Sequence, residues 1–425
     1  MNSRSTLDGS THPADPLAWI ATVLSMVGLI ITMAGSWLGA LLFLGAWAVI
    51  GLVRAGQCLR LVFRAPELWV VGGLALASTG WSVAPEVTLR AAVQLLLTVG
   101  IASLAAGFLR PRDFVSAMAV SLLFGAVLSV LFGREGIDGM TGARVFLGIF
   151  ASKNTMALFM SFLAIFGVAV LFDRGQQPVL RGLAAIAIVL GVPLLLLARS
   201  AGATLTTAAS LAVLLAVSGF ARLSPRGRLA TLAVAIAVVL PCVVLATLLA
   251  LNGTLGEEVS VFIASGLGKD PTLTGRTVLW QIALDEIGRR PLQGTGYYAF
   301  WLQGYPLAEA IWRSFSIESR MGFHFHNTIL EFAVELGWPG VAALVGTLVL
   351  AIVRAVRLAL SDRTMASGAL VASLFCLATR MAGEVDTPYP FAVGTFLMFV
   401  VAAYGADDAR RTAGVVAMWR PAQPA

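Results

Sequence analysis

Residues 155–172 read TMALFMSFLAIFGVAVLF, eighteen consecutive positions without a charged side chain. A helix needs about 20 mostly apolar residues to cross a hydrocarbon core of about 30 Å. Each run of this kind is expected to be helical, because an open sheet would leave backbone polar groups unpaired in lipid. Eleven further apolar runs occur along the chain, near 18–34, 36–53, 68–82, 91–109, 113–132, 179–198, 201–219, 229–251, 338–353, 366–383 and 388–405.

These runs predict an all-α, polytopic integral membrane protein with about twelve transmembrane helices. The short run at 68–82 and the long run at 229–251 leave eleven or thirteen spans open. The composition excludes an ordinary soluble domain, because 58% of residues are hydrophobic, 12% are charged and the mean hydropathy is +0.88. The first run is expected to be a retained anchor and not a cleaved signal peptide, since a second span follows almost at once.

The arginines predict the orientation of the chain. Cytoplasmic loops of membrane proteins carry an excess of basic residues, whereas long loops are translocated regardless of charge. A cytoplasmic N-terminus places the following residues inside: Arg4, Arg54, Arg60, Arg64, Arg110, Arg112, Arg174, Arg181, Arg222, Arg226, Arg228, Arg354, Arg357, Arg363, Arg410, Arg411 and Arg420. Both termini are therefore expected in the cytoplasm. The formal net charge of +7 is explained by this bias and requires no nucleic-acid partner.

A single long polar segment interrupts the apolar pattern, and it is expected outside the cytoplasm. The predicted division is a cytoplasmic tail at 1–17, nine spans within 18–251, a periplasmic segment at 252–337, three spans within 338–405 and a cytoplasmic tail at 406–425. The three cysteines lie in or beside apolar runs without a CxxC pattern, so they are interpreted as small core residues.

The polar segment contains helical periodicity and is not a simple linker. Apolar residues recur at helical spacing after Thr274, which is a plausible N-cap, and the pattern stops at Pro291. A second helix is expected to begin at Asn327 and to break at Gly337 and Pro339 before the next span. The aromatic run at 297–301 would suit the interface with lipid headgroups.

Two of the three histidines, His324 and His326, directly precede this second helix. A neutral His326 can accept a proton from a hydroxyl near neutral pH. Alternatively, it packs at the membrane interface and bonds a carbonyl group. Asn327 either caps the helix or orients a substrate, and Glu331 would hold the ring of His326 if the two side chains face each other. We predict substrate-binding roles for His324, Asn327 and Glu331.

The two histidines with a carboxylate would also suit zinc. Their spacing argues against a metal, because the usual helical pair lies four residues apart and no third histidine is nearby. The third histidine, His12, lies on the opposite side of the membrane in the predicted topology. We therefore predict no metal and no other cofactor.

Several cations accompany the histidines on the predicted outer face. Arg199 lies where two apolar runs meet, and a guanidinium there costs a few kcal/mol unless it is paired. It either snorkels to the interface or grips a diphosphate with its two-pronged donor geometry. Arg276, at the start of a predicted helix, has the same two interpretations, and helix N-termini favour anions. Lys153 and Asn154 begin the span at 155–172 and form a third candidate.

The chain carries no Walker loop, Rossmann fingerprint, nucleophile elbow or DxD-type acidic cluster. A donor that arrives through the membrane is therefore expected. Three blocks occur in order, GRTVLW from Gly275, PLQGTG from Pro291, and His326-Asn327 with Glu335, Gly337 and Gly340. Together with the long segment before the last three spans, they resemble the bacterial O-antigen ligase and O-antigen/exopolysaccharide polymerase family.

That resemblance implies a metal-independent, inverting glycosyltransferase at the periplasmic face of the bacterial inner membrane. Its donor would be an undecaprenyl-diphosphate-linked oligosaccharide, and its acceptor a glycan or lipid A core. By the same resemblance, Arg199 and Arg276 bind the diphosphate, and His326 activates or aligns the acceptor hydroxyl. Membrane lipids, a chain-length regulator and a flippase are the further partners implied.

The Lys153-Asn154 pair resembles the exopolysaccharide-polymerase branch, which makes a polymerase the favoured function and a ligase the first alternative. A transporter or flippase is the alternative from another class. Carriers commonly place ionisable residues at mid-membrane within repeated halves. Here nearly every charge falls at the end of a predicted span, which favours the enzyme.

Overall fold

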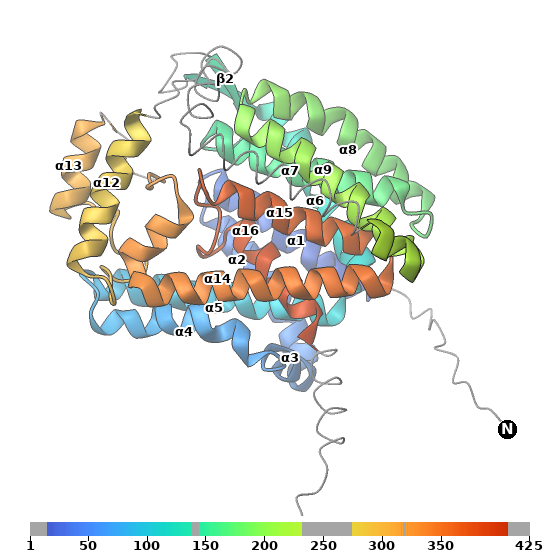
Figure 1. Ribbon diagram of the computed structural model, residues 1–425, viewed down its shortest axis with the longest axis horizontal. Helices are drawn as coiled ribbons and strands as arrows, with labels where there is room; N and C mark the ends of the chain where they lie inside the picture. The colour runs from blue at the N-terminus through green and yellow to red at the C-terminus, as the bar shows by residue number, and fades with distance from the viewer. Residues whose placement is uncertain are drawn as a thin grey trace, which may run out of the picture.

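The computed structural model describes residues 15–137, 144–231, 274–315, 317, 320 and 322–406. Within these ranges the chain is a bundle of helices, as predicted (Figure 1). The one sheet in these ranges is a hairpin that the sequence analysis did not anticipate. Its strands, β1 (Arg134–Ile137) and β2 (Arg144–Gly148), pair antiparallel between α6 and α7.

Seven helices are long and apolar enough to cross a membrane, namely α1 (Pro16–Met33), α5 (Pro85–Phe108), α6 (Pro111–Phe132), α7 (Lys153–Phe172), α8 (Pro178–Leu197), α9 (Ala201–Arg222) and α14 (Thr328–Asp362). An eighth candidate is the pair α2 (Leu38–Val53) and α3 (Ala55–Val62), which is bent by 118°. The described residues thus confirm a polytopic α-helical membrane protein with seven or eight candidate spans, fewer than the twelve expected.

The remaining predicted runs account for the difference. Residues 66–80 form the short helix α4 (Val70–Ala77) between two 3₁₀ turns, Pro66–Trp69 and Ser78–Gly80. The last two runs are the apolar helices α15 (Met365–Arg380) and α16 (Val393–Tyr404), which are shorter than a typical span. The run at 229–251 lies almost entirely outside the described residues.

Proline and burial explain how this bundle is built. Helices α1, α5, α6 and α8 each begin with proline, whose fixed φ and missing N–H suit the first helical turn. Helix α7 lies deep in the bundle, whereas α8 and α9 present most of their apolar side chains outward. Outward-facing apolar residues are what a lipid environment requires, since helices there satisfy their backbone groups internally.

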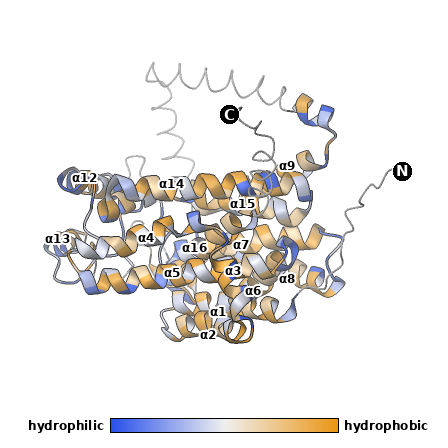
Figure 2. Ribbon diagram, turned by 90° about the horizontal axis from the view of Figure 1, so that it is seen from below, coloured by the Kyte–Doolittle hydropathy of each residue, from blue (hydrophilic) through white to orange (hydrophobic). Residues whose placement is uncertain are grey.

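The polar helices α12 (Thr274–Arg289) and α13 (Pro306–Ser314) lie at one end of the long helices (Figure 1). In Figure 2 these two helices carry hydrophilic residues, whereas the long helices are mostly hydrophobic. Helix α12 begins at Thr274 and ends before Pro291, as predicted. The aromatic run differs from expectation, because Tyr297 and Phe300 are fully buried against α14 and its neighbours and do not face a headgroup region.

Helix α14 starts at the same end of the bundle, and both of its predicted boundary signals are confirmed. The Asn327 side-chain oxygen accepts hydrogen bonds from the backbone N–H groups of Ile329 (3.0 Å) and Leu330 (3.1 Å), which caps the helix. Gly337 has φ 65° and ψ −171°, a region that essentially only glycine adopts. The helix kinks there and then continues to Asp362.

Arginines gather at the opposite end of the bundle. A cavity there is lined by residues from the ends of α6, α7, α9 and α14, including Arg112, Arg174, Arg222 and Arg363. Arg112 forms a two-pronged ion pair with Asp173, at 2.8 and 3.2 Å. The histidine-bearing end and this arginine-rich end are therefore opposite faces of one helical bundle.

Candidate active site at the polar end of the bundle

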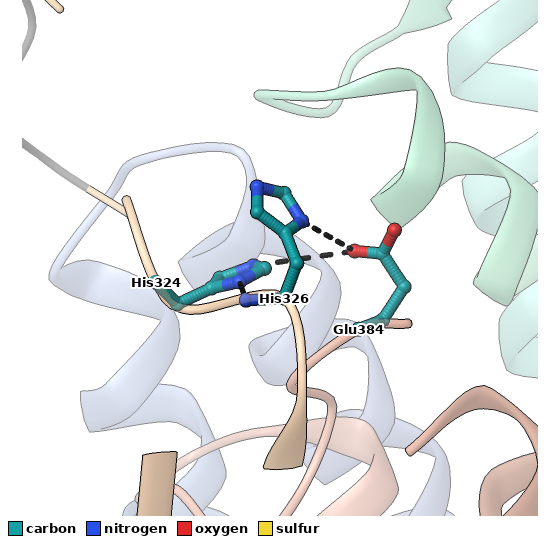
Figure 3. A group of neighbouring side chains, drawn as sticks. All are labelled: His324, His326 and Glu384. Atoms are coloured by element: carbon teal, nitrogen blue, oxygen red, sulfur yellow. Dashed lines mark hydrogen bonds and ion pairs between the residues drawn. The ribbon is translucent and has the colours of Figure 1, made fainter. Parts of the chain in front are cut away.

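The carboxylate of Glu384, in the loop between α15 and α16, is the centre of the candidate site. Asn154 at the start of α7 donates from Nδ2 to Glu384 Oε1 at 2.7 Å. The Arg276 guanidinium in the first turn of α12 lies 3.4 Å from the same oxygen. The rings of His324 and His326 face the other oxygen, with Nε2 of His324 at 4.0 Å and Nδ1 of His326 at 3.9 Å (Figure 3).

A short, tightly held loop presents the two histidines. Phe325 between them is fully buried, its N–H donates to Glu331 at 2.7 Å, and its carbonyl accepts from the Trp280 indole at 2.9 Å. His326 adopts φ 53°, a left-handed conformation that costs of order 1–3 kcal/mol for a residue with a side chain. Anchoring Phe325 from both sides therefore turns both imidazoles toward Glu384.

The hydrogen bonds of the loop also indicate which ring nitrogen of His324 carries the proton. The backbone N–H of His326 donates to Nδ1 of His324 at 3.0 Å. A neutral His324 therefore carries its proton on Nε2, the atom that faces Glu384. Nδ1 of His326 is buried and has no hydrogen-bond partner in the described part of the chain. That nitrogen faces the carboxylate of Glu384 at 3.9 Å, beyond hydrogen-bond distance.

Glu331 and the ring of His326 do not face each other, so the contact considered from the sequence is not formed. Glu331 is fully buried, and its carboxylate accepts hydrogen bonds from Trp301 Nε1 (2.7 Å), Tyr389 OH (2.9 Å) and the Phe325 N–H. The first turn of α14 directs Glu331 beneath the loop, whereas His326 points across to α15. Glu331 thus holds the backbone of the histidine loop, and Glu384 faces the imidazole.

The electrostatic setting separates the protonation behaviour of these groups. Burial, the neighbouring ring of His324 and the charge of Arg276 lower the pKa of His326 to about 3. Burial, Arg276 and Arg380 lower the pKa of His324 to about 4. Burial raises the pKa of Glu384 to about 7, against the opposing charge of Arg380. Both imidazoles are therefore neutral near pH 7, while Glu384 titrates there.

The other predicted site residues lie at different distances from this centre. The Asn154 side-chain oxygen accepts from the Ser200 hydroxyl at 3.3 Å, which ties α7 to the turn between α8 and α9. Lys153 lies close enough for its charge to oppose the rise in the pKa of Glu384. Arg199, beside Ser200, is exposed and adopts φ 49°, and its side chain makes no hydrogen bond or ion pair with the described residues. Asn327 uses its side chain as the cap of α14.

Glu384 is not among the site residues predicted above, although its charge and those of Arg380 and Asp386 indicate a structural ion network at the end of the apolar run at 366–383. Part of that network is present, since Arg380 grips Asp386 through two hydrogen bonds of 2.6 and 3.3 Å. Arg380 also donates to the backbone carbonyl of Asn154 at 3.3 Å. The sequence shows that Glu384 lies near the end of an apolar run. It does not show the partners of Glu384, Asn154 and Arg276, because they come from distant parts of the chain.

The comparisons with known proteins bear on the whole arrangement. Residues 184–345 match the protein family described as O-antigen ligase (Wzy_C). The chain is also 34% identical, over 382 residues, to the exopolysaccharide production protein ExoQ of Rhizobium meliloti (strain 1021). That alignment covers 89% of this chain and 85% of the relative. The chain belongs to the O-antigen ligase family. The resemblance proposed from the sequence motifs is thereby confirmed.

The family match spans Arg199, Arg276 and the histidine loop, and Glu384 lies beyond its end. His324, His326 and Glu384 also form the one potential metal-binding group found among the described residues, with ligand atoms within 4.8 Å of one another. Their surroundings fit a metal dication poorly. Glu384 Oε1 already interacts with Asn154 and Arg276, and the charges of Arg276, Arg380 and Lys153 act on the same group.

A cavity of about 550 Å³ extends from this cluster into the bundle. Its polar end contains Asn154, His324 and Glu384. Its other end is aromatic and includes Tyr298, Trp301, Phe323 and Tyr389. The volume falls within the range of about 300–1,000 Å³ that is typical of ligand pockets. This family member thus joins a charged cluster and an aromatic chamber in one cavity.

The raised pKa of Glu384 predicts a pH-dependent effect of Glu384→Gln on stability. The folded protein binds this proton more tightly than the unfolded chain, so the stability from protonated Glu384 is complete below pH 4.5 and is lost as pH rises through about 7. Glutamine loses nothing over that window. The stability of the variant relative to wild type should therefore increase from pH 5 to pH 7.5, by on the order of 1–3 kcal/mol.

Thermal unfolding of the purified protein in detergent, followed by intrinsic fluorescence, measures this difference. The histidines cancel in the comparison, because they are neutral in the folded state between pH 5 and pH 7.5 and titrate alike in the two unfolded chains. Glu135→Gln, at a position 64% exposed in the hairpin, is the matched control and should show a constant difference. A constant difference for Glu384→Gln as well would contradict the burial of a titrating carboxyl group at the centre of the site.

Proposed function

We propose that this protein is a glycosyltransferase that polymerises undecaprenyl-diphosphate-linked repeat units into exopolysaccharide or O-antigen. The observation that carries the proposal is the juxtaposition of the neutral His326 imidazole with Arg276 and with Glu384, which lines a cavity. The name of the relative, an exopolysaccharide production protein, supports the polymer product. The family description supports transfer of a lipid-linked glycan.

The proposed topology has about twelve spans, both termini in the cytoplasm and the site at the periplasmic face of a bacterial inner membrane. The arginine-rich cavity at the opposite end of the bundle supports this orientation, because basic residues are retained on the cytoplasmic side. In this orientation residues 252–337 are periplasmic, and a lipid-linked donor reaches the site laterally from the membrane.

Arg276 is proposed to bind the diphosphate of the donor. Its guanidinium is partly exposed, at 24%, and its present partner Glu384 lies at the long distance of 3.4 Å, so an anion can replace that contact. The position in the first turn of α12 adds the donors of a helix N-terminus. Arg199, exposed at the turn beside Ser200, supplies a second cation. These cations stabilise the charge that develops on the diphosphate as it leaves.

His326 is proposed to accept the proton of the acceptor hydroxyl. The acceptor oxygen forms a bond to the anomeric carbon as the bond from that carbon to the diphosphate breaks on the opposite face. The proton passes to the imidazole of His326, and the carboxylate of Glu384, 3.9 Å from Nδ1, stabilises the imidazolium that results. A bound diphosphate adds negative charge near the ring, which raises the pKa of His326 toward the value that a base requires.

The second candidate within the family is a ligase that transfers the glycan to lipid A core, and it is supported by the family description, which names an O-antigen ligase. The polymerase is favoured by the relative and by the Lys153-Asn154 pair, which lies within the site through Asn154. Both reactions use the same donor chemistry and differ in the acceptor. A chain-length regulator and a flippase are proposed as partners of either.

We predict that His326→Ala abolishes glycan transfer, by at least about 100-fold, because the general base is lost. The measurement is a gel profile of surface and lipid-linked glycans from a deletion strain that expresses the variant. Single repeat units on the lipid carrier would establish the polymerase, and long carrier-bound chains with bare lipid A core would establish the ligase. Arg313→Ala, at an exposed position of α13, is the control and should give the wild-type profile.

Protein level in the membrane, measured by immunoblot, should be near normal for both variants. A wild-type glycan profile in the His326→Ala strain would remove this residue from the mechanism. A profile unchanged even in the deletion strain would favour the transport alternative.

Arg276→Lys should lower transfer activity at least tenfold, because a point charge cannot replace a two-pronged guanidinium on a diphosphate. Arg289→Lys is the matched control on the same helix, since Arg289 is 68% exposed and pairs with Glu286. Activity is measured with purified protein in detergent and lipid-linked repeat units extracted from the deletion strain. Equal activity of the two variants would assign Arg276 to simple headgroup contact.

The proposed mechanism uses no metal, so EDTA should leave the activity of the purified enzyme unchanged. The assay is the same transfer reaction, before and after dialysis against the chelator. Loss of activity that Zn²⁺ or Mg²⁺ restores would instead assign the histidine–carboxylate cluster to a metal.

A further inference from the structure

The aromatic end of the cavity contains a buried carboxyl oxygen without a partner. Glu335, one turn after Glu331 on α14, is 2% exposed and lines the cavity. Its Oε1 accepts a hydrogen bond of 3.4 Å from Tyr389 OH, whereas Oε2 has no hydrogen-bond partner within the described ranges. An unsatisfied buried polar atom costs about 1–3 kcal/mol. Such an atom beside a cavity is a site for a donor that arrives with a ligand.

The walls around this oxygen are aromatic and geometrically fixed. Tyr298 and Tyr389 pack edge to face, with ring centroids 5.3 Å apart at 89°. Trp301 is held by the hydrogen bond from its indole N–H to Glu331, and its ring lies 4.8 Å from Phe325. Tyr298 remains 42% exposed, so its ring is open to a ligand. Electron-rich ring faces attract polarised C–H groups, such as those on the face of a pyranose.

The two groups of residues around the cavity differ in chemistry. Arg276 and His326 lie beside Glu384, which lines the polar part, and the proposed function places the diphosphate there. In the aromatic part, the Glu335 oxygen without a hydrogen-bond partner offers an acceptor to a hydroxyl donor. A sugar ring carries many such donors together with apolar C–H faces. The chemistry of the aromatic end therefore matches the glycan part of the substrate.

We propose that Glu335, with Tyr298, Trp301 and Tyr389, forms a subsite for one sugar ring of the lipid-linked glycan, and that a ring hydroxyl donates to Glu335 Oε2. The proposal rests on the proposed function, because it takes the diphosphate to be bound at Arg276. Glu331 is a positioning residue in this arrangement, since it orients Trp301 and Tyr389 and anchors the histidine loop. A site built to pair a hydroxyl discriminates strongly against a ligand that lacks it.

Two ligands that differ only in the glycan test the subsite. Undecaprenyl diphosphate and the undecaprenyl-diphosphate-linked repeat unit from the deletion strain are titrated against purified protein by thermophoresis. Glu335→Leu should weaken binding of the glycan-bearing ligand at least tenfold and leave undecaprenyl diphosphate within twofold. Glu335→Gln should bind both nearly as wild type does, because an amide still pairs with a hydroxyl.

Glu286→Leu makes the same change at a buried carboxyl group of α12 that does not line the cavity, and both affinities should be retained. Tyr298→Ala, at an exposed position, tests the aromatic wall without a large change in the core and should weaken only the glycan-bearing ligand, several-fold. Loss of both affinities in Glu335→Leu would show that this variant does not fold. In that case Tyr298→Ala alone tests the subsite.

Unchanged glycan affinity in Glu335→Leu or Tyr298→Ala overturns the subsite and leaves the proposed function intact. Equal affinity of the wild type for the two ligands also overturns it, because the glycan then makes no contact of consequence. Failure of the wild type to bind either ligand overturns the proposed function itself.

Discussion

The contacts of the Glu384 carboxylate are the interactions on which the arrangement of the polar end of the molecule depends. This carboxylate lies among the charges of Arg276, Lys153 and Arg380, all of which act on it. One oxygen connects Asn154 on α7 with Arg276 on α12, and the other faces the histidine loop before α14. Mutual repulsion among the cations is thereby offset, and segments more than 200 residues apart in sequence are brought together.

The same cluster explains why a strained loop can be retained. Two features of His326 destabilise the folded state: its left-handed backbone conformation, and its buried Nδ1 atom without a hydrogen-bond partner among the described residues. They are compensated by the burial of Phe325 and by its hydrogen bonds to Trp280 and Glu331. A preorganised functional group needs a rigidly held backbone and a polar atom that is not already hydrogen-bonded. The anchored Phe325 backbone and the His326 ring provide these two features.

Much of this arrangement was predictable from the sequence, because it depends on local chemistry. Apolar runs identified the membrane helices, Asn327 and Gly337 marked the start and the kink of α14, and the rarity of histidine singled out the loop at 324–326. The partner of His326 was not predictable in the same way. Glu331 is close in sequence, whereas Glu384 is close in space only because α15 packs beside α14 and returns to the same end.

The aromatic run was misplaced for a related reason, since periodicity does not distinguish a membrane interface from a buried chamber. The described residues give seven or eight candidate spans, because helices such as α15 and α16 are shorter than their apolar runs.

The dispersal of the site along the chain has a consequence for biosynthesis. Asn154 enters the membrane with the first half of the protein, Arg276 and the histidines follow, and Glu384 is made only shortly before the final helix, α16. A ribosome-bound precursor therefore has the cations and the imidazoles but lacks the carboxylate that organises them. The cluster is complete only after α15 and the loop that follows it have packed beside α7 and α14. A product truncated before Glu384 therefore lacks the carboxylate at the centre of the cluster.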